Sequence, residues 1–570
     1  MPDWDMTADV VIAGSGGAAL TAALAARHHG LDVLVAEKTD LIGGSTAMSG
    51  GGVWIPDSPP MRAAGSPDSE KDALAYFQAV VGDAGAEGPA TSAERRQAFI
   101  RTGPRVIAFL TSQGIPFRYA EGYSDYYCDR PGGKDRGRTL EAHPFDTNRL
   151  GPWKGKLRPG SSAGLGLIGY GTELTRMSYY NRSLIDLLTG VKVLARTYGG
   201  KLRGQALTSN GGALAGRLLE QALARGVQVW TQAPVTDLIM TGDRVTGAIV
   251  SRSTAGKDGK ELRVRARRAV LLAAGGFARS EELRQTHGGD QATTAAWTFA
   301  SPGDTGEVME LAIKLGAATD LLDEAIWGPG PRMPDGSPPK PYGGKRLNAF
   351  SRARWRPGTI IVDAAGSRFV NEAVSYMEVG KTMFAHDQVS PSVPAWLIFD
   401  DSYRRRSLFG IVPGDLPRKW IDDGFILKAD SLAELAAQAG ISPEGLEATV
   451  RRFNSHARAG KDPDFGRGDR AYDWFMGDPR LGALAPLDTG PYYASAQYPG
   501  DFGTCGGLLT DERARVLTEA GEPIGGLYAA GNASATVMGR HYLGAGASIS
   551  PALVFGYIAA TGIAGASSDQ

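Results

Sequence analysis

The sequence predicts an α/β protein, in which a Rossmann-like dinucleotide-binding domain is interrupted by an inserted α+β domain. Three observations predict this fold class. A short apolar run at residues 10–13 leads directly into a glycine loop that fits G-x-G-x-x-A. Apolar runs of the same kind return at 270–276 and 526–532, and each contains or ends in glycine. Residues 326–503 differ in character, because dense prolines and aromatics give way to helical patterns.

The first predicted element is a buried strand at 10–13, followed by its glycine loop and a helix. Gly14 permits a tight turn, Gly16 lets the backbone approach a diphosphate, and Ala19 lets the helix lie close to the strand. Residues 20–29 are rich in alanine and predict that helix. Its first N–H groups then face the phosphates.

The next predicted strand, 32–36, ends at Glu37, where a carboxylate can accept hydrogen bonds from ribose hydroxyls. Strand, loop, helix, strand and acid in this order predict a dinucleotide site. Small and hydroxyl residues follow in the sequence Gly-Gly-Ser-Thr at 43–46. This stretch resembles flavoproteins of the fumarate reductase type, and the resemblance implies FAD rather than NAD.

Composition bounds the class of protein. The chain has 570 residues, which is too long for one core, and its net charge is zero. This balance does not favour nucleic acid as a partner. Two cysteines argue against a disulfide framework and suit a reducing cytoplasm. Seven scattered histidines without ligand spacing predict no metal site.

Two stretches raise the question of membrane contact. Residues 547–566 are apolar and uncharged, and we interpret them as a buried helix with Pro551 near its start, a membrane anchor being the alternative. Residues 151–205 contain a helical stretch with mostly basic charges. Its spaced apolar residues are Leu184, Leu187, Leu188, Val191 and Leu194. An ordinary surface hairpin and a basic amphipathic lobe on a membrane surface both stay open.

Residues 206–277 return to the nucleotide fold with a helix at 211–225, a strand at 227–230, paired strands at 235–240 and 244–251, and a buried strand at 270–276. Residues 526–532 predict its closing strand. We therefore expect an FAD-binding domain from 1–325 and 504–570, and a catalytic domain from 326–503.

Three tyrosines stand where chemistry is expected. Tyr126 lies in a predicted aromatic loop, Tyr376 comes shortly after the sequence Phe-Val-Asn-Glu at 369–372, and Tyr542 precedes the apolar helix. Tyr542 offers a phenolic O–H, and Gly546 offers a backbone N–H four residues later. Two donors on one oxygen make an oxyanion-type site for a ketone that becomes an enolate.

The chain resembles the 3-ketosteroid Δ1-dehydrogenases, FAD enzymes that insert a C1–C2 double bond into steroid ring A. The resemblance covers nearly the whole chain. It rests on the Gly14 fingerprint and on residues 43–55, 125–127, 371–376, 503–507 and 527–546. The 151–205 segment departs from compact members and resembles an insertion of long members, one that covers the active-site mouth or touches a membrane.

By that resemblance, Tyr376 is the general base that removes the C2 proton, and Tyr126 hydrogen-bonds to it and stabilises its phenolate. Tyr542 and Gly546 bind the C3 carbonyl oxygen, which acidifies C2, while a hydride leaves C1 for the flavin. A free tyrosine has a pKa of about 10 and is a poor base at neutral pH. We therefore expect a rate that rises with pH well above 7.

The resemblance also implies the FAD contacts and the partners. The expected FAD-binding residues are Gly14, Gly16, Gly17, Ala18, Glu37, Lys38, Gly43, Gly44, Ser45, Thr46, Val235, Ala274, Gly275, Gly531, Asn532, Ser548 and Ile549. The expected partners are a 3-ketosteroid and a quinone or other electron acceptor. We expect a cytoplasmic protein, with the inner face of the cell membrane as a peripheral contact of the 151–205 lobe.

Other functions stay open at this point. A 3-ketosteroid Δ4-(5α)-dehydrogenase or a fumarate reductase-like enzyme uses the same frame. Fumarate reduction needs arginines and a histidine that grip two carboxylates, whereas this chain offers tyrosines. A flavin-bound module that only binds a ligand or a membrane surface is the hypothesis from another class. The preferred steroid side chain and the oligomeric state are not determined by the sequence.

Overall fold

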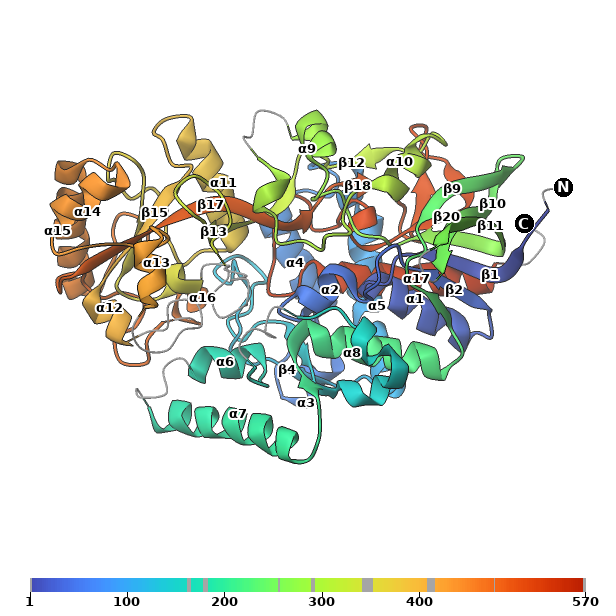
Figure 1. The fold of residues 1–570 in the computed structure, drawn as a ribbon, viewed down its shortest axis with the longest axis horizontal. Helices are drawn as coiled ribbons and strands as arrows, with labels where there is room; N and C mark the ends of the chain where they lie inside the picture. The colour runs from blue at the N-terminus through green and yellow to red at the C-terminus, as the bar shows by residue number, and fades with distance from the viewer. Residues whose placement is uncertain are drawn as a thin grey trace.

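The computed structural model describes residues 3–160, 166–177, 183–254, 257–288, 293–340, 352–406, 416–475 and 477–566. It is an elongated molecule with a large sheet towards one end and a smaller sheet towards the other (Figure 1). Both chain termini lie beside the large sheet.

The large sheet has eight strands among the described residues, and its centre is parallel. β1 (Met6–Ala13) lies between β2 (Val33–Ala36) and β11 (Lys257–Leu272) and runs parallel to both. β20 (Pro523–Ala529) pairs in parallel with β11, and β8 (Gln228–Trp230) pairs in parallel with β2. The returning apolar runs of the sequence therefore do join the first strand in one sheet.

Antiparallel strands extend this sheet at one edge. β9 (Val235–Thr241) and β10 (Arg244–Thr254) form the predicted pair, and β10 also pairs with β11. β19 (Arg515–Leu517) pairs with β20. The alternating burial of the residues along β10 fits a strand with one face on the core.

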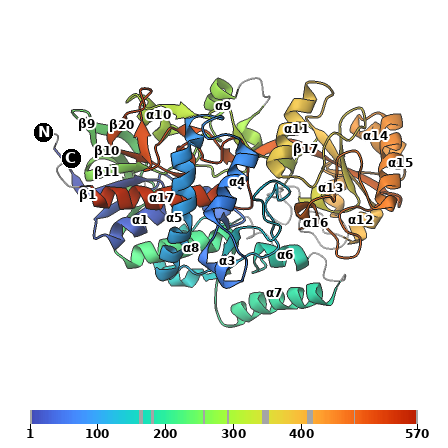
Figure 2. The ribbon, with the colours of Figure 1, turned by 180° about the vertical axis from the view of Figure 1, so that it is seen from behind.

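Two apolar helices lie against each other on one face of the large sheet (Figure 2). They are α1 (Gly17–His28) and α17 (Ile549–Gly565), and both are largely buried. Gly556 permits their close approach, since a Cβ there would lie 2.5 Å from the Ala18 carbonyl oxygen. The apolar run 547–566 is thus a buried helix, as predicted. No helix in the described ranges is long and apolar enough to cross a membrane.

The second sheet is antiparallel and has five strands within the described ranges. Its order is β13 (Ala325–Pro331), β17 (Tyr492–Thr504), β15 (Ala395–Asp400) and β14 (Thr359–Val362), with β16 (Leu427–Ala429) on β17. The long β17 runs from this sheet towards the large one (Figure 1).

Helices surround the second sheet. α14 (Leu432–Ala439) and α15 (Pro443–Ala459) lie at its outer end, and α11 (Tyr376–Asp387) packs on β13. Gly380 makes the contact of α11 possible, since a Cβ there would lie 2.5 Å from the Trp327 Cβ.

The remaining elements connect and cover the sheets. The helices are α2 (Gly44–Met48), α3 (Pro59–Ala63), α4 (Glu70–Val81), α5 (Ala93–Ser112), α6 (Gly171–Met177), α7 (Leu184–Leu202), α8 (Asn210–Ala224), α9 (Glu281–His287), α10 (Glu307–Ile313), α12 (Asp401–Arg406), α13 (Arg418–Asp422) and α16 (Ala471–Phe475). The strands are β3 (Gly52–Trp54), β4 (Phe117–Tyr119), β5 (Thr139–Ala142), β6 (Phe145–Asp146), β7 (Leu207–Thr208), β12 (Thr319–Asp320) and β18 (Gly507–Leu508). Short 3-10 turns are η1 (Pro89–Thr91), η2 (Thr147–Lys156), η4 (Ala295–Trp297), η5 (Arg352–Trp355) and η6 (Gly531–Ala533).

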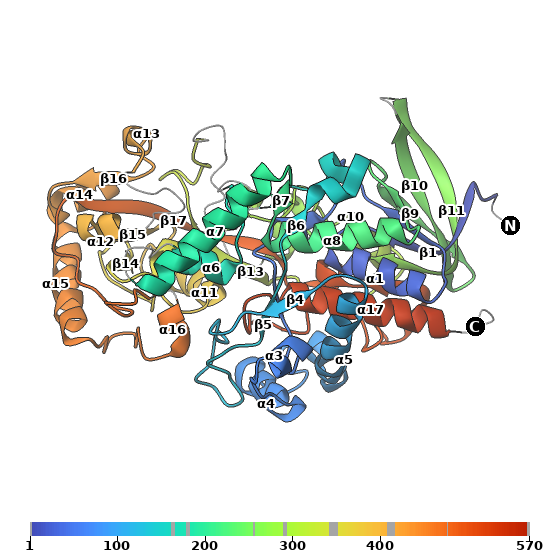
Figure 3. The same ribbon diagram turned by 90° about the horizontal axis from the view of Figure 1, so that it is seen from below.

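Helix α7 stands out on the surface (Figure 3), where it packs on the shorter α6. Its buried residues are small or polar, with one valine: Asp186, Gly190, Val193, Thr197 and Gly200. Its exposed residues include most of its large apolar side chains: Leu184, Ile185, Leu187, Leu188, Val191, Leu194, Tyr198 and Leu202. The apolar stripe predicted from the sequence therefore faces outwards.

Candidate active site

The glycine loop after β1 forms a tight turn against β11. Gly14 has φ +95°, and a Cβ at this position would clash with the carbonyl oxygen of Ala273. Gly16 is the N-cap residue of α1, so the free N–H groups of that helix begin here. The strand, turn and helix thus present an anion-binding helix end, as the fingerprint predicts.

A second helix end faces the first. Gly43 and Gly44 both have positive φ, and they start α2. The Gly17 N–H donates to the Thr46 hydroxyl at 3.0 Å, which ties α2 to α1. A Cβ added at Gly16 or at Gly44 would meet no more than one atom, 3.8 Å away. These two backbone faces are therefore open, and they fit a diphosphate between the helix ends.

Glu37 lies at the end of β2, as predicted, and is buried. Its carboxylate accepts hydrogen bonds from the Ser15 hydroxyl at 2.6 Å and from the Thr39 amide at 2.8 Å. The Gly43 amide donates to the Ser15 oxygen at 3.1 Å. Ser15 therefore links the fingerprint loop to the second loop, a role that the sequence pattern did not reveal.

The side chain of Lys38 points to α10, where its Nζ donates to the Glu307 carboxylate at 2.8 Å. Ser45 donates to Asp304 at 2.9 Å. Burial raises the pKa of Asp304 to about 7, and the hydrogen bond from Ser45 opposes this rise. Gly275 approaches the same carboxylate closely. Sequence reasoning missed Asp304, although its setting in Gly-Asp-Thr-Gly at 303–306 was a usable signal.

A small cavity lies near the N-terminus of α17. Its lining includes Gly531, Asn532, Tyr542 and Ser548, which were predicted site residues from two motifs. Ile549 is the first residue of α17. The cavity thus lies between a helix N-terminus and one of the predicted tyrosines.

Two predicted cofactor residues lie in the core of the large sheet. Val235 on β9 is buried in an apolar cluster, and Ala274 packs against the same cluster. Ala18 is buried at the start of α1, 3.4 Å from the position of a Cβ on Gly531. Contacts of these residues with FAD stay predictions.

The three predicted tyrosines form one buried cluster. The ring centroids of Tyr376 and Tyr542 are 5.0 Å apart, and Tyr126 lies 5.6 Å from the first and 5.7 Å from the second. Tyr376 begins α11, Tyr126 lies in the loop between β4 and β5, and Tyr542 lies before α17. Chain segments more than 400 residues apart therefore supply one site, although the hydrogen bond predicted between Tyr126 and Tyr376 stays a prediction.

The cluster is a poor environment for a phenolate. Burial raises the pKa of Tyr376 well above its ordinary value, and the neighbouring phenol of Tyr542 adds to the rise. Burial also raises the pKa of Tyr126, with Tyr123 as the next cause. The structure thus increases the tension that the sequence already posed, because the proposed base is harder to ionise here than in water.

The two predicted donors lie close to each other in the chain. Tyr542 shares a hydrogen bond of 3.1 Å with the Ser548 hydroxyl. Gly546 has φ +98°, and a Cβ there would clash with the Gly52 carbonyl oxygen. No described residue accepts a hydrogen bond from the Gly546 amide. That N–H is therefore available to a ligand.

Sequence reasoning missed two further aromatics. Tyr472 on α16 lies 4.4 Å from Tyr126, which is closer than the other two tyrosines. Tyr123 lies 6.4 Å from Tyr126 and stacks on Phe475 at 4.0 Å. The only signal was the aromatic run at 472–475, which has no chemical signature of its own.

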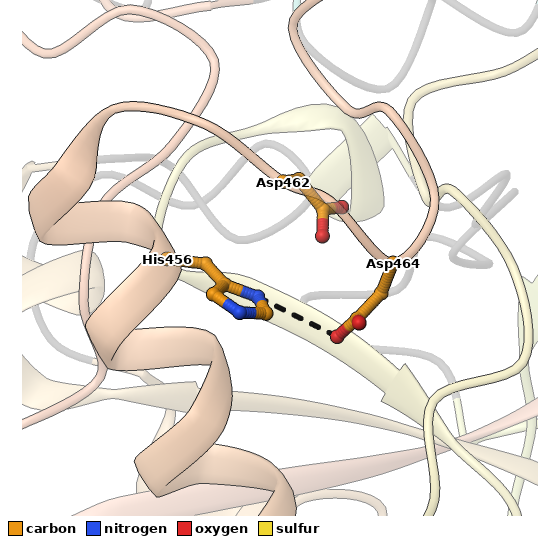
Figure 4. Close-up of side chains that lie close together, drawn as sticks. All are labelled: His456, Asp462 and Asp464. Atoms are coloured by element: carbon orange, nitrogen blue, oxygen red, sulfur yellow. Dashed lines mark ion pairs between the residues drawn. The ribbon is translucent and has the colours of Figure 1, made fainter.

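A group with the composition of a metal site lies elsewhere. His456, Asp462 and Asp464 lie close together (Figure 4), with ligand atoms within 4.8 Å of one another. Asp462 accepts hydrogen bonds of 3.1 and 2.9 Å from Arg368, and Asp464 binds Arg452. Both carboxylates already bind a guanidinium, so we interpret the group as an ion-pair network.

Fold and candidate site together define the class, a flavoprotein oxidoreductase. The FAD binding domain family matches residues 9–549. The 3-oxosteroid 1-dehydrogenase of Mycolicibacterium smegmatis is 40% identical over 98% of this chain and 97% of its own length. The 4-oxocyclohex-2-ene-1-carboxylate 5-dehydrogenase of Sinomonas cyclohexanicum is 35% identical over 98% of this chain and 93% of its own.

Solved structures agree. The 3-ketosteroid Δ1-dehydrogenase of Sterolibacterium denitrificans, in complex with 1,4-androstadiene-3,17-dione, is 36% identical, with a TM-score of 0.89 over 98% of this chain and 99% of that one. A 3-ketosteroid Δ4-(5α)-dehydrogenase of Rhodococcus jostii is 22% identical, with a TM-score of 0.67 over 99% and 98%, and shares the fold. The chain belongs to the 3-oxosteroid 1-dehydrogenase family of flavoproteins, and its cofactor is FAD.

Proposed function

We propose that this protein is an FAD-dependent 3-ketosteroid Δ1-dehydrogenase, which removes the hydrogens at C1 and C2 of steroid ring A. The observation that carries the proposal is the buried cluster of Tyr126, Tyr376 and Tyr542, whose ring centroids lie 5.0 to 5.7 Å apart. Three phenols from distant segments in one apolar site fit a ketone substrate without carboxylates. When bound, FAD supplies the acceptor for the hydride from C1.

The residues divide the remaining work. The Tyr542 hydroxyl and the Gly546 amide donate to the C3 carbonyl oxygen, so that negative charge developing on that oxygen is stabilised. Tyr376 takes the C2 proton, which the polarised carbonyl has made acidic. Tyr126 donates a hydrogen bond to Tyr376 and stabilises its phenolate. The buried rings exclude water, which strengthens each of these interactions.

The relatives leave a second candidate substrate class. Two relatives from Sinomonas cyclohexanicum, 35% and 34% identical, are named as dehydrogenases of oxocyclohexane or oxocyclohexene carboxylates. The chemistry is the same, because a ring ketone acidifies the carbon next to it. Such a substrate requires a cation for its carboxylate, whereas a steroid requires apolar surface.

Anaerobic titration of the purified, FAD-loaded protein tests both substrates. We expect androst-4-ene-3,17-dione to bleach the flavin absorbance and to give a product lighter by two hydrogens, with the double bond at C1–C2 by NMR. A C4–C5 product from a 5α-reduced steroid would assign the Δ4 reaction instead. Bleaching by 4-oxocyclohexanecarboxylate alone would replace the steroid, and no bleaching by either would favour a binding module.

We also propose that the outer face of α7 contacts a lipid surface. The proposal is supported by the exposed stripe of large apolar residues, including Leu188 and Leu202, and by cations beside it such as Lys192 and Lys201. Apolar residues flanked by cations favour anionic lipid headgroups over water. A quinone dissolved in that lipid is then the electron acceptor that we propose.

The division of the chain into two domains is also a proposal. We assign 326–503 to the catalytic domain and the rest to the FAD-binding domain. Tyr376 belongs to the first part, whereas Tyr126 and Tyr542 belong to the second. The active site therefore lies where the two proposed domains meet.

A further inference from the structure

Arg354 is a fully buried arginine in η5, next to the segment that leads into α11. Its Nη1 donates to the Val374 carbonyl oxygen at 2.9 Å and also to the carbonyl oxygen of Glu372. Ser375 follows as the N-cap of α11, and Tyr376 is the first residue of that helix. Arg354 therefore holds the backbone that places the proposed base.

The rest of the guanidinium has no partner. Its Nε and Nη2 are buried and donate no hydrogen bond to any described residue. No described carboxylate lies within ion-pair distance of Arg354. A buried cation with unpaired N–H groups costs stability, so it calls for an explanation in function.

A chain of aromatic rings connects the guanidinium of Arg354 with the tyrosine cluster. It lies 4.3 Å from the ring centre of Trp355, the Trp355 ring lies 6.1 Å from that of Tyr472, and Tyr472 lies 4.4 Å from Tyr126. In a buried, apolar region a charge acts over such distances with little screening.

Several neighbouring charges form ion pairs with one another. Arg368 and Arg467 bind the carboxylate of Glu372, and Arg368 also binds Asp462. These are two cations and two anions. A further pair, Arg470 and Asp473, lies 3.7 Å apart beside Tyr472. The positive charge of Arg354 has no ion-pair partner among the described residues.

We propose that Arg354 is a positioning residue that fixes Tyr376 through the backbone before α11 and supplies the positive charge that stabilises a phenolate in the tyrosine cluster. This inference rests on the proposed function, because it concerns how the tyrosine base becomes ionised. It answers the tension noted above, since burial and the phenols of Tyr542, Tyr123 and Tyr472 all raise the pKa of Tyr376. Burial lowers the pKa of Arg354 to about 10, and Tyr472 and Tyr126 oppose this fall.

The test compares variants of the FAD-loaded protein in the dependence of kcat/KM on pH from 6 to 10. Arg354→Gln retains an N–H donor and removes the charge, so the rise in rate moves to higher pH by about one unit or more. The rate at pH 7 then falls by about tenfold. Arg354→Lys keeps the charge, so the midpoint of the rise in rate stays the same. We expect kcat to drop, because an ammonium does not reproduce the hydrogen bonds of the guanidinium to the backbone carbonyls.

Arg96→Met is the matched control. Arg96 is also buried, donates to the backbone carbonyls of Gly82 and Asp83, and has an unpaired Nε. The ring that it packs over is Phe77, which is not a member of the tyrosine cluster. For Arg96→Met we expect the rate to rise with pH at the same midpoint as in the native protein. The ultraviolet absorbance of tyrosinate, followed by pH titration, should show the same order of midpoints as the kinetics.

Several outcomes would overturn the proposal. One is a folded, flavin-bound Arg354→Gln protein with the midpoint of the native protein. Arg354→Met serves in its place if the glutamine variant does not fold. An Arg354→Lys variant whose midpoint rises by more than one unit would also contradict it, as would an equal shift in Arg96→Met. If the native protein does not turn over a 3-ketosteroid, the proposed function itself fails, and this outcome is separate from all the others.

Discussion

At the residue scale the central question is how a buried tyrosine can take a proton. Apolar surroundings disfavour the phenolate of Tyr376, yet the same surroundings strengthen the donors that polarise the substrate. The sequence predicted Tyr126, Tyr376 and Tyr542 as a set, and the structure brings their rings together. The sequence did not reveal Tyr472, because its contact with Tyr126 joins residues 346 positions apart and leaves no local pattern.

Tyr376→Phe should abolish turnover while FAD stays bound. The ring packing is kept and only the hydroxyl that accepts the proton is lost, so we expect a fall in kcat of about 10²- to 10⁴-fold or more. Steady-state assays together with the flavin spectrum provide the measurement. The control is Tyr198→Phe, which removes a hydroxyl from an exposed ring. Near-normal turnover by Tyr376→Phe would make the assignment of the base wrong.

The rate of the native enzyme should rise with pH above 7. The active form of the base is the phenolate, and burial raises the pKa of Tyr376, so the active fraction is small at neutral pH and grows as pH increases. The measurement is kcat/KM from pH 6 to 10 at constant ionic strength. A flat profile over this range would argue against a tyrosine base.

Gly546→Ala should lose both turnover and stability. The backbone at this position has a positive φ, which disfavours alanine. The added methyl group would also clash with the Gly52 carbonyl oxygen. Gly65→Ala is the control, because Gly65 has positive φ but open space around it. We expect a cost of about 1 kcal/mol for the control and of a few kcal/mol for Gly546→Ala by chemical denaturation. Equal costs for the two would show that the clash is relieved.

At the element scale, two helices rich in apolar residues expose these residues to different extents. The run that forms α17 is uniformly apolar, and it is buried against α1 and the large sheet. α7 has apolar residues on one stripe, but it is the small and polar side, such as Gly190 and Thr197, that faces the protein. Periodicity predicted the α7 stripe correctly, but only the packing shows which side of it faces outwards.

Exposure of the α7 stripe leads to a test with vesicles. Leu187→Asp/Leu188→Asp should reduce binding to anionic phospholipid vesicles by about tenfold or more. Two leucines that become buried in the lipid surface contribute several kcal/mol to the free energy of binding. Flotation of vesicles with the bound protein measures this. Val389→Asp is the control, since Val389 is an isolated exposed valine elsewhere on the surface.

Three results would contradict lipid contact. Binding that does not change in the double variant would exclude this face. Equal loss in Val389→Asp would indicate a general charge effect. A change from dimer to monomer in the double variant, without native binding to vesicles, would assign the stripe to a second copy of the chain.

At the scale of the whole molecule, the FAD site that we propose joins segments from both ends of the chain. The fingerprint loop contacts the second loop at 43–46, and this loop contacts Asp304. We propose that these segments and the region 531–549 bind the cofactor together. Removal of FAD should therefore lower the melting temperature by several degrees, and added FAD should restore it in proportion to the logarithm of its concentration. Calorimetry of the apo and holo proteins measures this. Equal melting temperatures would mean that the cofactor does not tie these segments together.

The sequence by itself determined the fold class, the dinucleotide fingerprint and most elements of the large sheet, whereas the three tyrosines were predicted through a family resemblance. The first three follow from local patterns, such as glycine spacing, apolar periodicity and short motifs, which act within a few tens of residues. Only the tertiary structure decided that Ser15 links two loops, that Asp304 is buried beside Ser45, and that Arg354 lies behind the tyrosines with an unbalanced charge. Burial and electrostatics depend on what surrounds a group from every side, and most of those neighbours come from remote parts of the chain.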